Sequence, residues 1–205
     1  RTILDYTDEY EKIPYEYNGE IFLEITSRAF NIFIQSGESL NQMRLINISN
    51  NLLDDYQLYQ FHKIKPIVFD NAKNNIHPVI SSGLKIAVDL NSNNKVIAYK
   101  AKKNAPVLYF HNKKHAVSDF WESIKSKDNS LTIFPGEFFI LKSKQKIRIP
   151  NNMAGEMIPY DSAIGDFRVH YAGFFDPGFG DPFGSFAVLE VRTNEVPFNL
   201  EDGQT

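Results

Sequence analysis

Short apolar runs separated by turn residues dominate the chain. The runs are rich in β-branched and aromatic residues, which is typical of strands, and they cover residues 21–25, 32–34, 84–90, 95–99, 107–110, 138–141 and 187–191. Turn pairs such as Ser36-Gly37 and Pro135-Gly136 lie between them and favour tight reversals of the chain. The pattern therefore predicts a mainly β fold.

Two segments depart from this pattern and predict short helices. Residues 116–125 place Phe120, Trp121 and Ile124 at helical spacing, with Ser118 as a possible cap. Residues 51–61 form the second predicted helix. We therefore expect one or two short helices beside the strands.

Basic residues alternate along one of the strand-rich segments. Lys142, Lys144, Lys146 and Arg148 occupy every second position, so on a regular strand their side chains share one face. Because charged side chains prefer water, this pattern predicts a solvated face.

Two stretches of equal length resemble each other and indicate an internal repeat. Residues 17–39 read YNGEIFLEITSRAFNIFIQSGES, and residues 183–205 read FGSFAVLEVRTNEVPFNLEDGQT. When the two stretches are aligned without a gap, their apolar residues fall at matching positions with the alternation of a strand. Three aligned pairs are identical: Leu23/Leu189, Glu24/Glu190 and Gly37/Gly203. We interpret residues 1–70 as the C-terminal part of one domain copy with a linker, and residues 71–205 as a second copy.

Composition excludes several classes of protein. The chain has 205 residues, 42% of them hydrophobic, and a net charge of -3, which favours a globular protein over a nucleic-acid-binding or disordered one. No apolar run approaches the roughly 20 residues that span a bilayer. The chain begins with Arg1 and shows no leader pattern, so we expect a piece of a longer protein and, by default, a soluble cytoplasmic one.

The chain offers no recognisable set of metal ligands. It contains no cysteine, which excludes disulfides, thiolate zinc sites and cysteine nucleophiles. The spacing of the histidines fits neither HExxH nor another metal motif; they are His62, His77, His111, His115 and His170. We therefore predict no protein-ligated metal and no zinc.

Two motif-like stretches give the sequence a family resemblance. They are PGEFFILKSKQKIRIPNNMAGEM at residues 135–157 and VHYAGFFDPGFGDPFGSFAVLEV at residues 169–191. The second contains the order A-x-x-x-D-P-G-F and then G-x-x-x-x-L-E. In these stretches the chain resembles the bacterial dCTP deaminases of the dUTPase-like superfamily, in their double-length form with two tandem copies. The resemblance implies a dUTPase-like distorted β-barrel, in parts of two tandem copies, with the second copy truncated at its C-terminus.

The resemblance implies a role for each matching residue. Glu190 would be the catalytic general base and acid, and Glu24 would be its equivalent in the first copy. The hydroxyl of Ser162 and the backbone carbonyl of Ala172 would hold the attacking water. On an apolar strand, desolvation would raise the pKa of Glu190 toward the operating pH.

Further matches imply the nucleoside pocket. Asp176 would accept a hydrogen bond from the sugar 3'-hydroxyl, although an Asp before Pro-Gly also forms turns. Phe175 or Phe179 would line the pocket and exclude a ribose. His170 and Tyr171 would line it as well, with packing as the alternative role for His170.

One part of the family pattern is altered. The family usually carries S-S-x-G/A-R before the pocket, whereas this chain reads DSAIGD at residues 161–166. Asp166 therefore stands where an arginine is expected, and a carboxylate would repel a triphosphate. Arg168, two positions later on a strand, would point to the same face and partly compensate.

The resemblance implies conversion of dCTP and water to dUTP and ammonia. Mg2+ would bind through the nucleotide triphosphate. The partners would be dCTP or dUTP and further copies of the chain in a trimer, with no nucleic acid and no membrane. A dUTP pyrophosphatase remains an alternative enzyme. A structural or nucleotide-sensing half that supports a trimer remains the non-catalytic alternative, which Asp166 favours.

Overall fold

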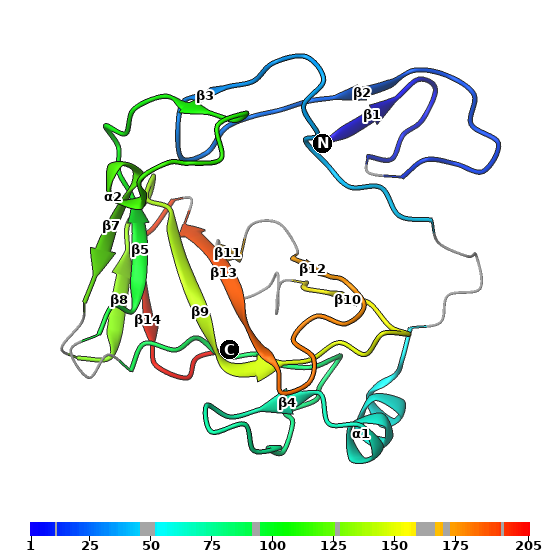
Figure 1. Ribbon diagram of the computed structural model, residues 1–205, viewed down its shortest axis with the longest axis vertical. Coiled ribbons are helices and arrows are strands. Elements are labelled where there is room, and N and C mark those ends of the chain that lie inside the picture. Colours follow the sequence, from blue (N-terminus) through cyan, green and yellow to red (C-terminus); the bar gives the residue numbers. More distant parts are fainter. Residues whose placement is uncertain are drawn as a thin grey trace.

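A computed structural model describes residues 1–10, 12–45, 52–91, 95–125, 128–158, 167–169, 173–193 and 195–205, with the backbone alone for 167–169. It is mainly β (Figure 1). The helices are α1 (Asp55–Ile64) and α2 (Val117–Phe120). The strands are β1 (Thr2–Leu4), β2 (Ile21–Leu23), β3 (Ile32–Phe33), β4 (Val68–Phe69), β5 (Ala98–Ala101), β6 (Leu108–Tyr109), β7 (Trp121–Ile124), β8 (Ser130–Ile133), β9 (Phe139–Ile147), β10 (Gly155–Glu156), β11 (Phe167–Val169), β12 (Phe174–Phe175), β13 (Ser185–Thr193) and β14 (Phe198–Glu201).

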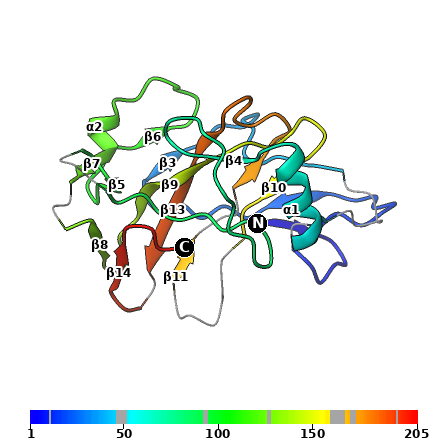
Figure 2. The same ribbon diagram turned by 90° about the horizontal axis from the view of Figure 1, so that it is seen from below.

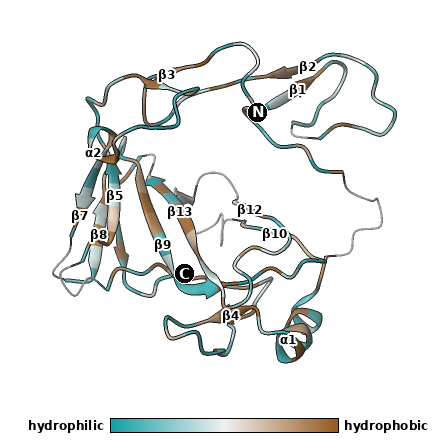
Figure 3. Ribbon diagram, viewed as in Figure 1, coloured by the Kyte–Doolittle hydropathy of each residue, from teal (hydrophilic) through white to brown (hydrophobic). Residues whose placement is uncertain are grey.

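The long strands β9 and β13 form the centre of the largest sheet. Its order is β11-β13-β9-β5-β7, and β4 also pairs with β9. Strands β9 and β13 run antiparallel, with Leu189 opposite Leu141 and Val191 opposite Phe139. Brown segments in Figure 3 follow the apolar positions of both strands. This pairing fixes which residues of β13 face the core.

Side-chain alternation along β13 divides the strand into two faces. Ala187, Leu189 and Val191 are at most 6% exposed and pack in the main core. Strands β8 and β14, which lie side by side in Figure 2, contribute Leu131 and Leu200 to the same core. The intervening residues of β13 point away from the core and are available for a site.

One predicted helix is confirmed and the other is mostly wrong. Helix α1 begins after Asp54, whose side chain accepts a hydrogen bond from the backbone N–H of Gln57 while the Gln57 side chain bonds back. Helix α2 ends at Phe120, and residues 121–124 instead form β7, paired with β5. Pairing to a sheet edge therefore overrode a helical spacing that only three apolar residues supported.

The predicted strand at 84–90 is extended but forms no named strand. Its hydrogen bonds go to several partners; for example, the N–H of Asp89 donates to the carbonyl of Lys142 (3.1 Å), and the N–H of Val88 donates to that of Gln204 (2.9 Å). The backbone N–H and C=O groups of this segment are therefore hydrogen-bonded without one continuous ladder between strands.

The three lysines of the basic run are not buried in β9, but the strand is irregular where they lie. The register with β13 shifts between Phe186, opposite Lys146, and Val188, opposite Lys142. The ammonium of Lys144 pairs with Asp202, whereas that of Lys142 lies 2.7 Å from Asp89. Alternation in the sequence assumed a straight strand, and this shift breaks it.

The two repeated stretches end in turns of the same kind. Gly37 and Gly203 have φ angles of 89° and 85°, which glycine adopts without strain. The N–H of Glu38 donates to the carbonyl of Gln35 (3.4 Å), as the N–H of Gln204 does to that of Glu201 (3.1 Å). The side chains of Glu38 and Gln204 in turn accept from the N–H of Gln35 and Glu201, at 2.9 and 3.1 Å.

Surroundings of the two repeats differ. Strand β3 pairs in parallel with β6, whereas β14 pairs antiparallel with β8. Ile21 and Leu23 of β2 are 54% and 37% exposed, whereas their counterparts Ala187 and Leu189 on β13 are buried. The repeat therefore keeps its local hydrogen bonds without the same packing.

Candidate active site

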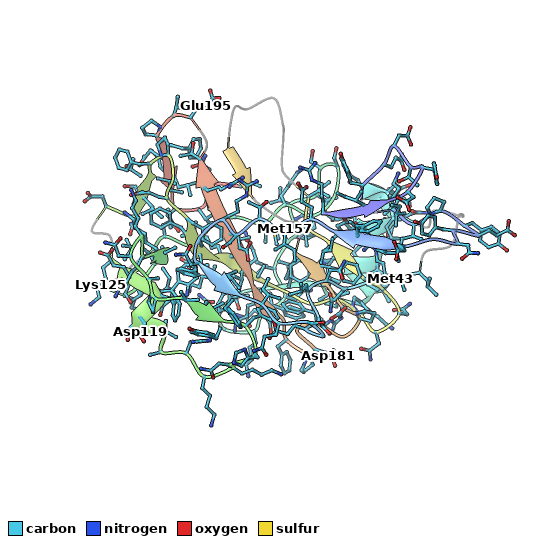
Figure 4. All side chains as sticks on the ribbon, turned by 90° about the horizontal axis from the view of Figure 1, so that it is seen from above. Met43, Asp119, Lys125, Met157, Asp181 and Glu195 are labelled. Atoms are coloured by element: carbon cyan, nitrogen blue, oxygen red, sulfur yellow. The ribbon has the colours of Figure 1, made fainter. Side chains whose placement is uncertain are left out.

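A hollow of about 280 Å³ lies against the outward face of β13. Its lining is aromatic and apolar apart from one carboxylate, that of Glu190. The lining residues are Met157, Gly173, Phe174, Phe175, Phe179, Phe186, Val188 and Glu190. Figure 4 labels Met157, which lies between β13 and the β10–β12 ribbon. An apolar hollow with one polar group is a usual form of small-molecule site.

The β10–β12 ribbon forms one wall of the hollow. It pairs Gly155 with Phe175 and Glu156 with Phe174. A Cβ atom on Gly173 would lie 3.0 Å from the Met157 side chain, so a larger residue there would push against this wall. The two phenylalanines line the hollow together with residues of β13.

The turn Asp176-Pro177-Gly178 positions the next wall residue. Gly178 has a φ of 86°, and its N–H donates to the carbonyl of Ile149 (2.9 Å). The N–H of Ile149 donates in return to the carbonyl of Phe179 (2.8 Å). The ring of Phe179 thus lies 4.9 Å from that of Phe175, centroid to centroid. Asp176 itself is exposed and is not among the lining residues.

Glu190 is partly buried on β13, opposite Ile140 of β9. Burial raises the pKa of its carboxyl above the ordinary value of 4.5. Within the described part of the chain, the structure records no ion pair or hydrogen bond to this carboxylate. A carboxyl that holds its proton at higher pH and faces a hollow is suited to proton transfer.

The raised pKa of Glu190 predicts a dependence of stability on pH. The ionised side chain is less favourable in the folded chain than in the unfolded one, so stability is lost as pH rises through the folded pKa. We expect Glu190→Gln to increase the urea midpoint near pH ~7, and the gain to disappear near pH ~4, where both states hold the proton. The control is Glu195→Gln, an exposed residue. Equal midpoints for wild type and Glu190→Gln at both pH values would contradict this prediction.

A second hollow, of about 470 Å³, lies beyond the Gly178 turn. Although it is larger, none of its lining side chains is aromatic, so it offers no ring to stack on a base. The lining residues are Lys65, Arg148, Pro150, Asn151, Asn152 and Asp181. The chemistry of the lining therefore favours the Glu190 hollow as the candidate site.

The structure brings together three of the predicted site residues: Glu190, Phe175 and Phe179. Arg168 is described by its backbone, which pairs with Arg192 of β13. The remaining second-copy predictions lie outside the described residues; they are Ser162, Asp166, His170, Tyr171 and Ala172.

Glu24, predicted as the equivalent of Glu190, lies in a different environment. It follows β2, its side chain is 49% exposed, and it forms an ion pair with Arg1. The Arg1 amino group also donates to its backbone carbonyl (2.7 Å). Glu24 is not among the residues that line the Glu190 hollow.

Sequence reasoning did not identify several residues of this region. Phe186 and Val188 follow from the alternation of β13, which places them on the face of Glu190. No sequence pattern marks Arg44 as part of this region, because the residues that it contacts lie far from it along the chain. Its guanidinium lies 2.7 Å from Glu156 and 4.5 Å from the Phe174 ring centroid, so Arg44 contacts the β10–β12 ribbon.

Two further observations concern metals and membranes. Among the described residues, no group of three or more His, Asp or Glu side chains is arranged to hold a metal ion. In the same residues, neither helix has the length and apolar character needed to cross a bilayer.

Comparisons with known proteins identify the family. The model of the 2'-deoxycytidine 5'-triphosphate deaminase (DCD) C-terminal domain matches residues 54–205, and that of the DCD N-terminal domain matches residues 1–49. A comparison with curated proteins finds no match.

A solved structure agrees with the family models. The crystal structure of 2'-deoxycytidine 5'-triphosphate deaminase from Agrobacterium tumefaciens is 36% identical, with a TM-score of 0.83. The match covers 100% of this chain and 62% of that chain, so this chain spans less than two thirds of the length of its relative. The likeness confirms the predicted dUTPase-like β fold. Because the C-terminal model alone matches most of its length, the chain belongs to the 2'-deoxycytidine 5'-triphosphate deaminase family.

Proposed function

We propose that the protein deaminates dCTP hydrolytically, giving dUTP and ammonia, with Glu190 as the proton-transfer residue and no metal held by protein ligands. Family membership supports the substrate and reaction. The observation that carries the role of Glu190 is its position: a carboxyl with a raised pKa in an otherwise aromatic and apolar hollow.

The chemistry needs one group that both accepts and donates protons. Glu190 takes a proton from the water that attacks C4 of the cytosine and delivers it to N3. After addition, the same carboxyl transfers the second proton of that water to the departing amino group, so ammonia leaves and the C4 carbonyl forms. A pKa raised by desolvation lies closer to neutrality, which favours a group that works in both directions.

Other residues of the proposed site have binding roles. The hydroxyl of Ser162 and the carbonyl of Ala172 hold the attacking water, and the exposed carboxylate of Asp176 accepts from the sugar 3'-hydroxyl. Phe175 and Phe179, whose rings are in contact, enclose the deoxyribose and leave no room for a 2'-hydroxyl. His170 and Tyr171 complete the wall, and Mg2+ arrives with the triphosphate as part of the substrate.

Arg168 offsets the carboxylate that Asp166 introduces. Support comes from the register of β11, where Arg168 lies opposite Arg192, two residues after Glu190 on β13. Residues directly opposite in an antiparallel pair belong to the same face of the sheet. Residue 168 of β11 is thus in register with an outward-facing position of β13.

The chain contains parts of two tandem copies, at residues 1–70 and 71–205, and works in the cytoplasm as a trimer. The matched turns around Gly37 and Gly203 support the duplication. Because Arg44 contacts Glu156 and Phe174, the first part also touches a wall of the site in the second.

This assignment predicts unequal roles for the two repeated glutamates. Glu24→Gln removes an exposed ion pair, which contributes little to stability because solvent screens it. We expect ammonia release from dCTP to stay within about twofold of wild type, measured beside Glu20→Gln, an exposed control on the same segment. A loss as large as that from changing Glu190 would place catalysis in the first copy.

The test of the proposed function compares two products. Purified protein is incubated with dCTP or dUTP and Mg2+, and ammonia and pyrophosphate are measured in each reaction. Ammonia from dCTP, with uracil nucleotide as the other product, supports the deaminase. Pyrophosphate from dUTP without ammonia from dCTP would favour the pyrophosphatase, and binding of dCTP without turnover would favour a sensing or structural half.

A further inference from the structure

The second hollow, of about 470 Å³, brings together two cationic side chains, those of Lys65 and Arg148. Lys65 comes directly after helix α1, and Arg148 comes directly after β9. The N–H of Arg148 donates to the carbonyl of Ile67 (2.9 Å), which holds the two segments side by side. Among the described residues, neither cation forms an ion pair with a carboxylate. Two positive charges therefore line one hollow without an anion to neutralise them.

The guanidinium of Arg148 is held in place by groups other than carboxylates. One terminal nitrogen donates to the carbonyl of Pro182 (3.4 Å), and the central carbon lies 5.7 Å from the centroid of the Phe69 ring. The Nε atom is shielded from solvent and has no hydrogen-bond partner in the described part of the chain. Because a guanidinium has five N–H donors, several remain for a ligand. A side chain that is already fixed also loses less entropy when a ligand binds to it.

Amide and carboxylate groups complete the lining of this hollow. Asn151 and Asn152 follow Pro150 in a turn, and each side chain carries an NH₂ group that can donate to an oxyanion. The Asp181 carboxylate is an acceptor in the same lining. Hydrogen phosphate fits this combination, because its oxygens accept from the donors while its P–O–H group donates to a carboxylate. Sulfate has the same shape but carries no proton to donate at neutral pH.

The second hollow is distinct from the Glu190 hollow, because the two share no lining residue. The Gly178 turn lies between them: a Cβ atom on Gly178 would lie 2.7 Å from Oδ1 of Asn151, whereas the next residue, Phe179, lines the Glu190 hollow. We infer that the second hollow is a binding site for inorganic phosphate, separate from the site of the proposed deamination. Its cations and amides bind the phosphate oxygens, and its carboxylate accepts the phosphate hydroxyl.

The first test measures the dissociation constant of inorganic phosphate by calorimetry at neutral pH. We expect Arg148→Gln to weaken phosphate binding about tenfold, which is ~1.4 kcal/mol, and Lys65→Gln to weaken it about threefold. The larger loss falls on the arginine because its donors form a fixed fork. The control is Lys63→Gln, which changes an exposed lysine of α1 outside the lining and should bind phosphate like wild type.

The second test compares phosphate with sulfate in the same experiment. Wild type should bind phosphate about tenfold more tightly than sulfate, because only phosphate donates a hydrogen bond to Asp181. Asp181→Asn removes the negative charge that favours a donor, so the preference for phosphate should largely disappear. Equal binding of the two anions by wild type would overturn the assignment of phosphate to this hollow.

The remaining outcomes separate this site from the proposed deamination. Undiminished phosphate binding in both Arg148→Gln and Lys65→Gln, or no binding by wild type, would overturn the phosphate site. Folding of each variant is checked by urea unfolding; if the contacts of Arg148 prove necessary for folding, the exposed Lys65 decides the test. Phosphate that competes with dCTP would belong to the nucleotide site and would also overturn the inference. A failure of the proposed deamination leaves the phosphate measurements unaffected.

Discussion

Replacing Glu190 with glutamine is expected to lower the kcat of ammonia release from dCTP by about 10²–10⁴-fold, the usual contribution of a positioned proton-transfer group. Glutamine keeps the shape of the side chain but neither accepts a proton from water nor delivers one to N3. Because the substitution removes no wall of the hollow, the dissociation constant for dCTP should change by less than about threefold. The pair of measurements therefore assigns the loss to the chemical step.

The matched control for this prediction is Glu195→Gln, which changes an exposed glutamate soon after the same strand. It should retain wild-type ammonia release. If Glu190→Gln keeps more than about half of the wild-type kcat, Glu190 does not carry the protons.

Truncating Phe139 to alanine is expected to reduce the free energy of unfolding by about 3–5 kcal/mol. The side chain is 2% exposed and belongs to the main core. Its removal leaves a cavity beside Val191, its partner on β13 and the neighbour of Glu190. Urea unfolding followed by fluorescence or circular dichroism gives the change directly.

Phe134→Ala is the control for this truncation, because that phenylalanine is 51% exposed and lies in the same part of the chain. It should cost less than about 1 kcal/mol, as surface substitutions usually do. Similar losses for the two variants would mean that the core is not centred on the β9–β13 pair.

The strands with clear alternation were predictable, and so was the candidate proton-transfer residue. The apolar run 187–191 predicted a strand, and β13 covers it; the alternating burial that puts Glu190 on the outward face is seen only in the structure. Family motifs then marked Glu190, Phe175 and Phe179, which the structure brings to one hollow. The strand prediction and the family motif therefore indicated the same segment of the chain.

Features that depend on distant partners could not be predicted. Trp121 and Ile124 match a helical period, yet they pair with Ala101 and Ala98 of β5. The basic run has strand alternation, but the register shift that separates Lys144 from its neighbours arises from pairing with β13. Arg44 contacts residues more than a hundred positions away, and no local pattern encodes that contact.

The burial of one face of β13 affects the entropic cost of binding a ligand at its other face. Leu189 and Val191, on either side of Glu190, are 6% and 1% exposed, so the backbone that carries the carboxyl is fixed by the packing of its neighbours. The conformational entropy that is lost by holding this carboxyl in place is therefore lost when the chain folds, and not when a ligand binds. In the proposed reaction, nucleotide binding therefore has little conformational freedom left to restrict at this position, and more of its binding free energy is available to favour the transition state.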